Sequence, residues 1–357
     1  MELRLISPVV FQDTNLSLSG HGFSCFAAAR YMAISTFGPA YPDLFFAYLY
    51  LYSHYDFLGI EAHHNALIRQ PSNPDALERY VLRQKLGLEL VELPIQDNLG
   101  EVIRQQLDMM LPVIVPIDRI RLDQIRLFIS KNYRFDVEIY PLLIIGCDSN
   151  KRQFIIYDNV RNHQPSQPSS SKEQDAYAQF SIDEDVLLEV FQTTDMHYQF
   201  KKDTIHTIQV KEEPPPSKSE ALHDIIAQIR AYHDHFPNLL QRKFAFLQGQ
   251  SHYQSSERDV MIREEIKYIN SQKILGDTLL RLLAEQNWSE ATRKQVKKAN
   301  IAAWQAWKKL HLGLSIMDSK GQRELSTLES LCSLVLRAEQ NFLQLIAHLE
   351  EENLIHD

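Results

Sequence analysis

Residues 140–148 read Tyr-Pro-Leu-Leu-Ile-Ile-Gly-Cys-Asp, an apolar run that leads into the turn-forming residues Asp148-Ser149-Asn150. Short runs of this kind, rich in β-branched residues and bounded by turn residues, are typical of buried strands. Comparable apolar or alternating runs occur at residues 88–93, 113–117, 154–157 and 205–210. We therefore expect a small antiparallel sheet in the first 210 residues.

Helical patterns lie between these strands along the chain. We expect helices at residues 25–37, 43–51, 74–85 and 99–111. A polar stretch rich in proline and serine, residues 163–171, predicts a loop. This mixture of helices and strands predicts an α+β domain over residues 1–210.

The character of the sequence changes near residue 211. Residues 211–218 read Lys-Glu-Glu-Pro-Pro-Pro-Ser-Lys, and three consecutive prolines fit neither a helix nor an inner strand, so we expect an exposed linker. Beyond the linker the apolar residues keep a helical period, which makes residues 219–357 an expected all-α helical bundle. Its expected helices are residues 220–232, 260–283, 290–312 and 325–349. An amphipathic helix such as the third could also bury its apolar face against a partner or a second copy of the chain.

The composition of the chain argues against several classes of function. The chain has 357 residues and a formal net charge of −9, so it is long enough for two cores and poorly suited to neutralising nucleic-acid phosphates. Its three cysteines, at positions 25, 147 and 332, form neither a disulfide framework nor a paired metal-binding motif. The most apolar window, Leu44–Leu51, is far shorter than the roughly 20 residues of a membrane-spanning helix. Since Met1–Arg4 also lacks the start of a secretory signal, we expect a cytoplasmic protein with no membrane segment, metal or resident cofactor.

Cys25 is the strongest candidate for a reactive residue. It follows a loop rich in small residues, Ser17–Ser24, and opens an expected helix. The amides and dipole at a helix N-terminus stabilise negative charge, so they favour a thiolate and can hold an oxyanion formed when sulfur attacks a carbonyl. The alternative is a small buried cysteine whose role is packing.

A thiol nucleophile also needs a base that takes its proton and a polar group that orients the base. Asp158 is the candidate for the orienting group, because it ends the expected strand 154–157, where a carboxylate can face a neighbouring strand. The alternative is that Asp158, followed by Asn159, forms a turn.

Four motifs occur in a characteristic order. They are Cys25 at the head of a helix, residues 112–118 (Pro-Val-Ile-Val-Pro-Ile-Asp), residues 140–148, and residues 155–159 (Ile-Ile-Tyr-Asp-Asn). In this order they resemble the papain-like proteins related to butirosin biosynthesis protein H, over about residues 10–210. The resemblance implies a papain-like α+β domain followed by a helical C-terminal region. It also implies the group's chemistry, which is transfer of an acyl group from a carrier-protein thioester to an amine in natural-product assembly. The motif at residues 140–148 is also similar to double-glycine peptidases.

The resemblance implies a catalytic histidine at position 140, where this chain has Tyr140. A phenol is protonated at neutral pH, so it is a poor acceptor for the proton of a thiol. Tyr140 could instead donate a hydrogen bond to a substrate carbonyl or to Asp158. His21, on the loop before Cys25, could fold back toward the sulfur and serve as the base; the alternative is a loop residue in a Gly-His-Gly turn.

Two functions of different class remain open, with Cys25, Tyr140, Asp158 and His21 as the catalytic candidates. In the first, Cys25 takes an acyl group from an acyl or peptidyl carrier protein, whose phosphopantetheine arm enters as part of the substrate. A small-molecule or peptide acceptor, through an amine or hydroxyl, then resolves the enzyme thioester. In the second, the fold is catalytically degenerate and serves as an accessory or scaffold protein that binds a carrier protein or a peptide intermediate.

Overall fold

The computed structural model describes residues 4–6, 25–38, 40–55, 76–95, 98–125, 139–159, 177–193, 203–211, 216–231, 276–282, 289–319 and 325–353. These residues form a mixed α+β structure that contains an antiparallel sheet and more helix than strand. Packing divides the chain into two compact units. The first comprises Met1–Pro42 and Leu67–Pro215, and the second comprises Asp43–Ala66 and Pro216–Asp357. The papain-like arrangement and the domain bounds given above stay predictions.

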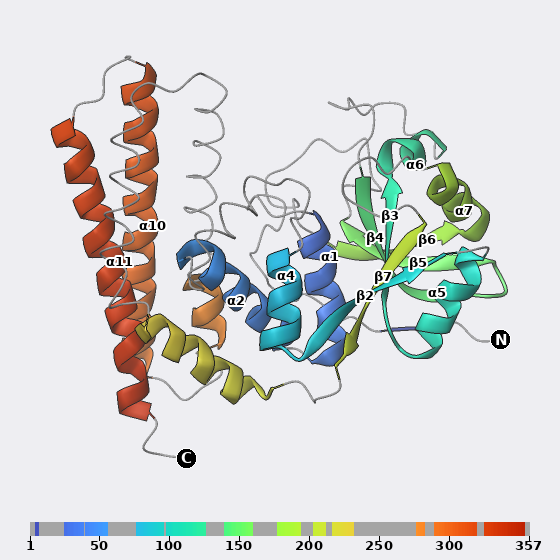
Figure 1. Ribbon diagram of the computed structural model, residues 1–357, viewed down its shortest axis with the longest axis horizontal. Coiled ribbons are helices and arrows are strands. Elements are labelled where there is room, and N and C mark those ends of the chain that lie inside the picture. Colours follow the sequence, from blue (N-terminus) through green and yellow to red (C-terminus); the bar gives the residue numbers. More distant parts are fainter. Residues whose placement is uncertain are drawn as a thin grey trace. The chain divides into compact units, whose positions relative to one another are not determined.

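The first unit is built on a sheet with six main strands (Figure 1). The strands are β2 (Leu88–Pro94), β3 (Val113–Asp118), β4 (Ile139–Asp148), β5 (Gln153–Asn159), β6 (Tyr177–Asp183) and β7 (Thr204–Val210). Their order is β2-β7-β3-β4-β5-β6, and every neighbouring pair is antiparallel. A short strand β1 (Arg4–Leu5) pairs with the end of β4. The predicted antiparallel sheet is thus confirmed, and its central strands β3 and β4 are almost entirely buried.

The predicted helices of this unit lie close to the observed ones. Helix α1 (Cys25–Ile34) continues as a 3-10 turn, η1 (Ser35–Phe37). Helix α4 (Ala76–Tyr80) continues as a π-helical turn, η2 (Val81–Lys85), and α5 (Leu99–Asp108) begins at the residue that the sequence predicts. The predicted loop at residues 163–171 lies outside the described residues.

Three elements of this unit were not predicted: β6, α6 (Arg119–Ile125) and α7 (Glu184–Thr193). Strand β6 lies at an edge of the sheet, and alternate residues such as Gln179 and Ser181 are exposed, so it lacks an apolar run. Helix α7 does carry a helical signal, because Leu187, Val190 and Phe191 are spaced as one apolar stripe and are buried. The stripe is short, and a short apolar stripe is an ambiguous pattern.

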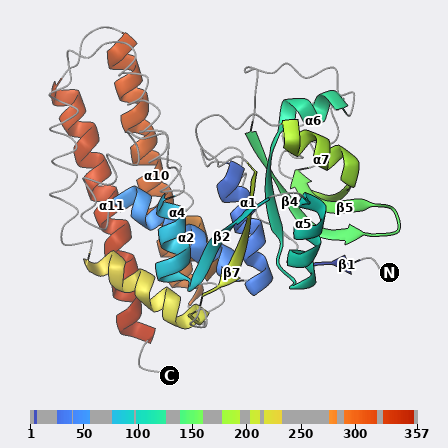
Figure 2. The same ribbon diagram turned by 45° about the vertical axis from the view of Figure 1, so that its right-hand side comes forward.

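Helices cover both faces of the sheet (Figures 1 and 2). Helices α5, α6 and α7 lie on one side, where they contact β3, β4 and β6. Helix α1 lies on the other side, where it contacts β3, β4 and β7. Residues 29–34 of α1 are all buried, so α1 is a core helix with no solvent face along that stretch. Because successive side chains of a strand point to opposite faces, neighbouring residues of β4 point into different helical layers.

A buried ion pair connects α1 to α4. The guanidinium of Arg30 contacts the carboxylate of Glu78, and both side chains are almost fully excluded from water. A cation inside a core is tolerated when a carboxylate accompanies it, because removing one partner leaves an uncompensated buried charge. This pair therefore links α4 to the buried helix α1.

We expect Glu78→Gln to lower the free energy of unfolding by about 3 kcal/mol, because it removes the negative charge and leaves the buried guanidinium. Chemical denaturation measures this loss. The matched control is Glu89→Gln, which breaks the half-exposed pair between Glu89 and Arg83 (3.8 Å) and should change stability by less than about 1 kcal/mol. Equal losses in the two variants would show that the buried pair has no special role.

The second unit is helical in its described part. Its helices are α2 (Tyr41–Tyr55), residues 218–231, residues 276–282, α10 (Glu290–Ser319) and α11 (Leu325–Asn353). Polar contacts hold α2 to the helices that follow the linker. The Arg281 guanidinium binds the Asp43 carboxylate at 2.7 and 3.1 Å, and the Tyr48 hydroxyl donates to the Asp224 carboxylate at 2.7 Å. These contacts explain why most of α2 groups with the C-terminal helices.

Helices α10 and α11 pack along their lengths. Their contact includes a buried polar link, because the Trp307 indole N–H donates to the Glu339 carboxylate. The structure thus has long helices at the two C-terminal positions that the sequence predicts. In the described ranges, no helix combines the length and apolar character required to cross a membrane.

Candidate functional site

Two of the predicted site residues meet at the ends of neighbouring strands. Tyr140 lies at the start of β4 and Asp158 near the end of β5, which pairs with β4 in antiparallel register. The Tyr140 hydroxyl donates a hydrogen bond to Asp158 Oδ1 at 2.6 Å. Asp158 is only 4% exposed, whereas Tyr140 is half-buried. The bond therefore gives a buried carboxylate one of the hydrogen bonds that it needs.

A cation covers the Tyr140 ring. Helix α6 begins where β3 ends, and the carboxylate of Asp118 accepts a hydrogen bond from the Ile120 amide at 2.9 Å, which favours this turn into a helix. Arg119, the first residue of α6, lies with its Cζ 4.8 Å from the centroid of the Tyr140 ring. Its Nε is 3.7 Å from Asp123 Oδ2 within the same helix. The Tyr140–Asp158 pair thus lies on the face of the sheet that α6 covers.

The other two predicted site residues belong to the N-terminal part of the chain. Cys25 is the first residue of α1, as the sequence predicts, but its side chain lies outside the described part of the structure. His21 also lies outside the described residues. Helix α1 packs on the face of the sheet opposite to α6 (Figures 1 and 2). The structure therefore brings Tyr140 and Asp158 together, and α1 approaches the sheet from its other side.

The direction of the Tyr140–Asp158 bond limits its chemistry. The phenol donates its O–H to the carboxylate, so this hydrogen bond is not offered to a substrate carbonyl at the same time. A protonated phenol also cannot take a proton from a thiol. Of the two roles that the sequence analysis allows for Tyr140, the structure has the hydrogen bond to Asp158. The pair can hold two strand ends together and can line a binding surface, but it does not constitute a general base.

Sequence reasoning missed Arg119. It directly follows the motif at residues 112–118, but nothing local to that motif connects it with Tyr140. The connection comes from the pairing of β3 with β4, in which Asp118 lies opposite Ile139. Register across a sheet sets this kind of neighbour, and a single sequence does not reveal register.

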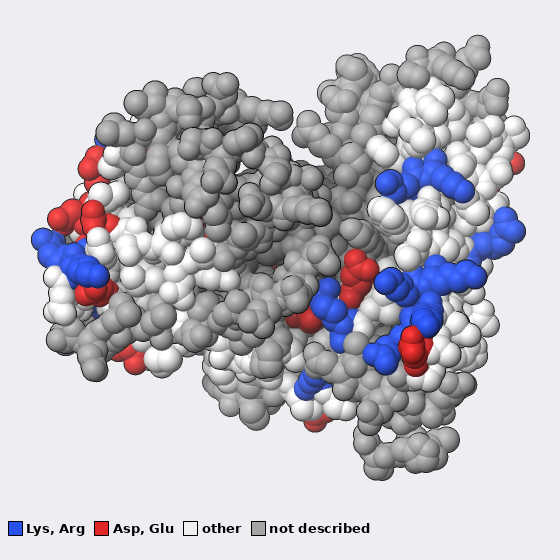
Figure 3. Space-filling view, turned by 180° about the vertical axis from the view of Figure 1, so that it is seen from behind, with Lys and Arg blue, Asp and Glu red and all other residues white. Residues whose placement is uncertain are grey.

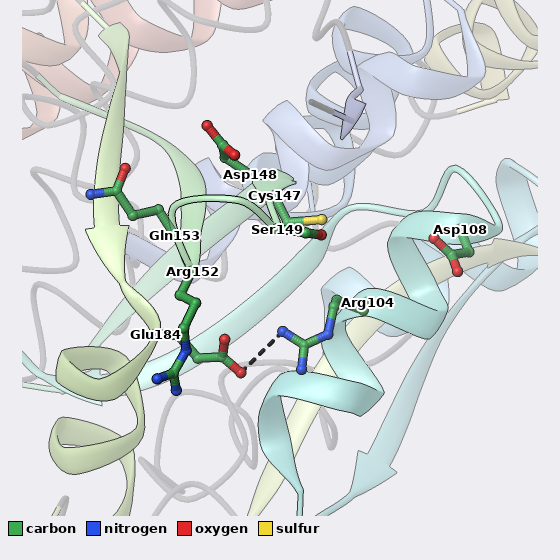
Figure 4. Close-up of a pocket in the computed structure, with 8 residues that line it drawn as sticks. All are labelled: Arg104, Asp108, Cys147, Asp148, Ser149, Arg152, Gln153 and Glu184. Carbon is green, nitrogen blue, oxygen red and sulfur yellow. Dashed lines mark hydrogen bonds and ion pairs between the residues drawn. The ribbon is translucent and has the colours of Figure 1, made fainter. Parts of the chain in front are cut away.

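A cavity of about 410 Å³ lies beside the turn between β4 and β5, at the opposite end of β4 from Tyr140 (Figure 4). Its lining residues are Arg104, Asp108, Cys147, Asp148, Ser149, Arg152, Gln153 and Glu184. Arg104 Nη1 lies 3.0 Å from Glu184 Oε1, and Arg152 Nη2 lies 2.9 Å from Asp185 Oδ1. Both arginines are therefore neutralised by carboxylates in the first turn of α7. These pairs tie α5 and the turn to α7.

Asp148 belongs to the turn itself. Its Oδ1 accepts hydrogen bonds from the Asn150 and Lys151 amides at 3.1 and 3.3 Å. Desolvation acts to raise the pKa of Asp148, but the hydrogen bonds and the charge of Lys151, with the Asn150 amide, outweigh it and hold that pKa below its usual range. Asp148 is thus an ionised turn residue, as its sequence context suggests.

No metal centre is evident in the residues that the structure describes, since no three His, Cys, Asp or Glu side chains there are grouped to hold an ion. Comparison with protein-family models gives no match to this chain, and comparison with curated proteins gives none either.

Gly100 is required by the ion pair beside the cavity, and its substitution tests that pair. A Cβ added at Gly100 would lie 2.3 Å from Glu184 Oε1, so Gly100→Ala must push this carboxylate away from Arg104. In an ordinary helix interior the same change stabilises by about 1 kcal/mol. We expect it to destabilise the wild-type chain by roughly 1 kcal/mol and to stabilise a Glu184→Ala background, as measured by denaturation. A gain in both backgrounds would refute this explanation.

Proposed function

We propose that this chain is a papain-like accessory protein that binds a carrier-protein-bound acyl or peptidyl intermediate without transferring the acyl group. The family and its carrier-bound substrates come from the resemblance of the motifs around Cys25, Tyr140 and Asp158. The absence of catalysis is inferred from the chemistry at position 140. The observation that carries the proposal is the hydrogen bond that Tyr140 donates to Asp158.

An acyltransferase needs a proton acceptor at this position, and a phenol in this hydrogen bond does not supply one. A thiol nucleophile requires a neighbouring group that accepts its proton, and this position holds a phenol that donates a hydrogen bond to a carboxylate. Arg119 covers the phenol ring and adds a positive charge, which opposes the protonation of any base placed beside it. The pair is therefore suited to maintaining the strand ends rather than to proton transfer.

The arrangement of the layers supports the same conclusion. A cysteine-dependent reaction needs the sulfur, the base and the orienting carboxylate within hydrogen-bond reach of one another. Tyr140 and Asp158 are on the α6 side of the sheet, while the helix headed by Cys25 packs on the other side. Binding of an intermediate does not require these groups to converge.

The second candidate is the cysteine-dependent acyltransferase, and one observation favours it. Helix α1 begins at Cys25, and backbone amides and the dipole at a helix N-terminus favour a thiolate. In this reaction the Cys25 sulfur would attack the carrier thioester, release the carrier thiol and keep the acyl group. An amine or hydroxyl acceptor would then attack the enzyme thioester.

One experiment separates the two candidates. An octanoyl-phosphopantetheine-loaded acyl carrier protein is mixed with the wild-type chain, binding is followed by fluorescence anisotropy of the labelled carrier, and the intact mass of the chain is then recorded. We expect saturable binding and no added octanoyl mass. Cys25→Ala should bind the carrier as the wild type does, because binding in the accessory role does not use the thiol.

The opposite outcome is equally clear. An octanoyl adduct that forms on the wild-type chain and on Cys332→Ala, but not on Cys25→Ala, would establish the acyltransferase. Cys332 is a suitable control because it is buried in α11, far along the chain from the motifs. No binding of the carrier at all would overturn the accessory role.

A further inference from the structure

Helix α10 carries an excess of positive charge in a chain that is acidic overall. Its cations are Arg293, Lys294, Lys297, Lys298, Lys308 and Lys309, and its acidic residues, Glu290 and Asp318, lie near its two ends. The whole chain has a formal net charge of −9. In the view from behind, Lys and Arg side chains gather in a band along this helix, on the right (Figure 3). Helix α10 is therefore a basic element of an acidic chain.

Seven exposed residues of α10 form a continuous stripe along the helix. Lys294, Lys298, Ile301, Gln305, Lys308, Leu312 and Ile316 follow one another at intervals of three or four residues and are all exposed. Residues at this spacing share one face of a helix. The opposite stripe is buried, from Val296 through Ala303 and Trp307 to Leu314, and it includes the contact with α11 through Trp307. One face of α10 thus belongs to the core, and the other faces outward.

Most of these cations are not neutralised within the described part of the chain. Lys294 pairs with Glu290 at 2.7 Å, but both side chains are about three-quarters exposed, so this pair contributes little. Lys308 lies with its Nζ 4.5 Å from the centroid of the Trp304 ring. Lys297, Lys298 and Lys309 make no ion pair with any described residue. Lys298 of the stripe and its neighbours Lys297 and Lys309 can therefore attract an external anion without first breaking an ion pair with a described residue.

Apolar side chains complete the stripe. Ile301, Leu312 and Ile316 are 41%, 60% and 46% exposed. Large apolar residues together with unpaired cations, on a rigid helix, match what protein interfaces use for affinity and for electrostatic steering. A partner that fits would present acidic side chains toward the lysines and apolar side chains toward Leu312 and Ile316.

We propose that the exposed stripe of α10, defined by Lys294, Lys298, Ile301, Gln305, Lys308, Leu312 and Ile316, is the docking surface for an acidic, helical carrier protein. This inference rests on the proposed function, because it names the surface on which the carrier is held. The lysines attract the acidic face of the carrier, and the apolar residues bury against it. The negative charge of the rest of the chain repels the carrier elsewhere and so directs it to α10.

Other anionic partners fit the stripe less well. A nucleic acid would gain from the lysines but not from the exposed apolar residues among them. An anionic bilayer is an extended surface, so it would also face the negatively charged remainder of the chain, which a small carrier protein can avoid. A protein partner of limited size uses both parts of the stripe and avoids the remaining surface.

The test compares two double charge reversals in the full chain. Lys298→Glu/Lys308→Glu reverses two exposed lysines of the stripe on α10, and Arg83→Glu/Lys151→Glu reverses two exposed cations of the first unit as the control. Binding of the labelled octanoyl-loaded acyl carrier protein is measured by anisotropy at low and high salt, and circular dichroism checks that both variants fold. We expect the α10 variant to raise the Kd at least about tenfold and the control to leave it within about twofold. Salt should weaken wild-type binding.

Each outcome decides the proposal. Carrier binding that survives the α10 reversal overturns the docking surface while leaving the proposed function intact. If the wild-type chain does not bind the carrier, the proposed function fails. An acidic amphipathic peptide then tests the surface by itself: binding that the α10 reversal abolishes supports it, and no binding overturns it. The docking surface is also overturned if the chain binds phosphatidylserine vesicles but neither the carrier nor the peptide. A dimer of the chain that the α10 reversal dissociates overturns it as well.

Discussion

The hydrogen bond from Tyr140 to Asp158 is the interaction on which this account of the protein depends. It joins the start of the central strand β4 to the end of β5, and it gives a nearly inaccessible carboxylate a partner. Arg119, delivered by the turn from β3 into α6, covers the same phenol. Three strand ends thus meet at one place through a phenol, a carboxylate and a guanidinium. Because the phenol O–H is engaged by the carboxylate and the ring by the guanidinium, we infer that the cluster is poorly suited to exchange protons with a substrate.

The two units carry different parts of the proposed activity. In the first unit, helices cover both faces of the sheet, and its charged side chains are largely paired, as at Arg30 with Glu78 and Arg104 with Glu184. In the second unit, α10 buries one stripe and leaves lysines exposed on the other. A surface with exposed cations and exposed apolar side chains can bind a partner through charge complementarity and apolar burial. The carrier docking that we propose for α10 does not depend on whether Cys25 reacts.

Local sequence patterns predicted the elements well where burial and period coincide. The strands at residues 88–93, 113–117, 140–145, 154–157 and 205–210 all occur, because short β-branched runs have few alternatives in a buried sheet. The edge strand β6 and the short helices α6 and α7 escaped prediction, since their apolar signals are brief or mixed with polar residues. Strand order and register depend on contacts between distant segments, so they could not be read from the sequence.

The candidate site shows the same division. The motif order identified Tyr140 and Asp158 as partners, and the structure places them in contact. Arg119 could not have been found, because it reaches Tyr140 only through the pairing of β3 with β4. The face of the sheet that each side chain occupies was also hidden, since it depends on where the helices pack. The face matters most for function, because the Tyr140–Asp158 pair lies on one face of the sheet and helix α1 packs on the other.

The most direct measurement of the central claim is a double-mutant cycle on the free energy of unfolding, with Tyr140→Phe, Asp158→Asn and the two changes combined. If the phenol donates a hydrogen bond to the carboxylate and this bond stabilises the fold, the cycle should give a coupling energy of about 1 to 3 kcal/mol. Additive effects, with Tyr140→Phe alone leaving stability unchanged, would contradict the account, because the phenol would then be available for another role.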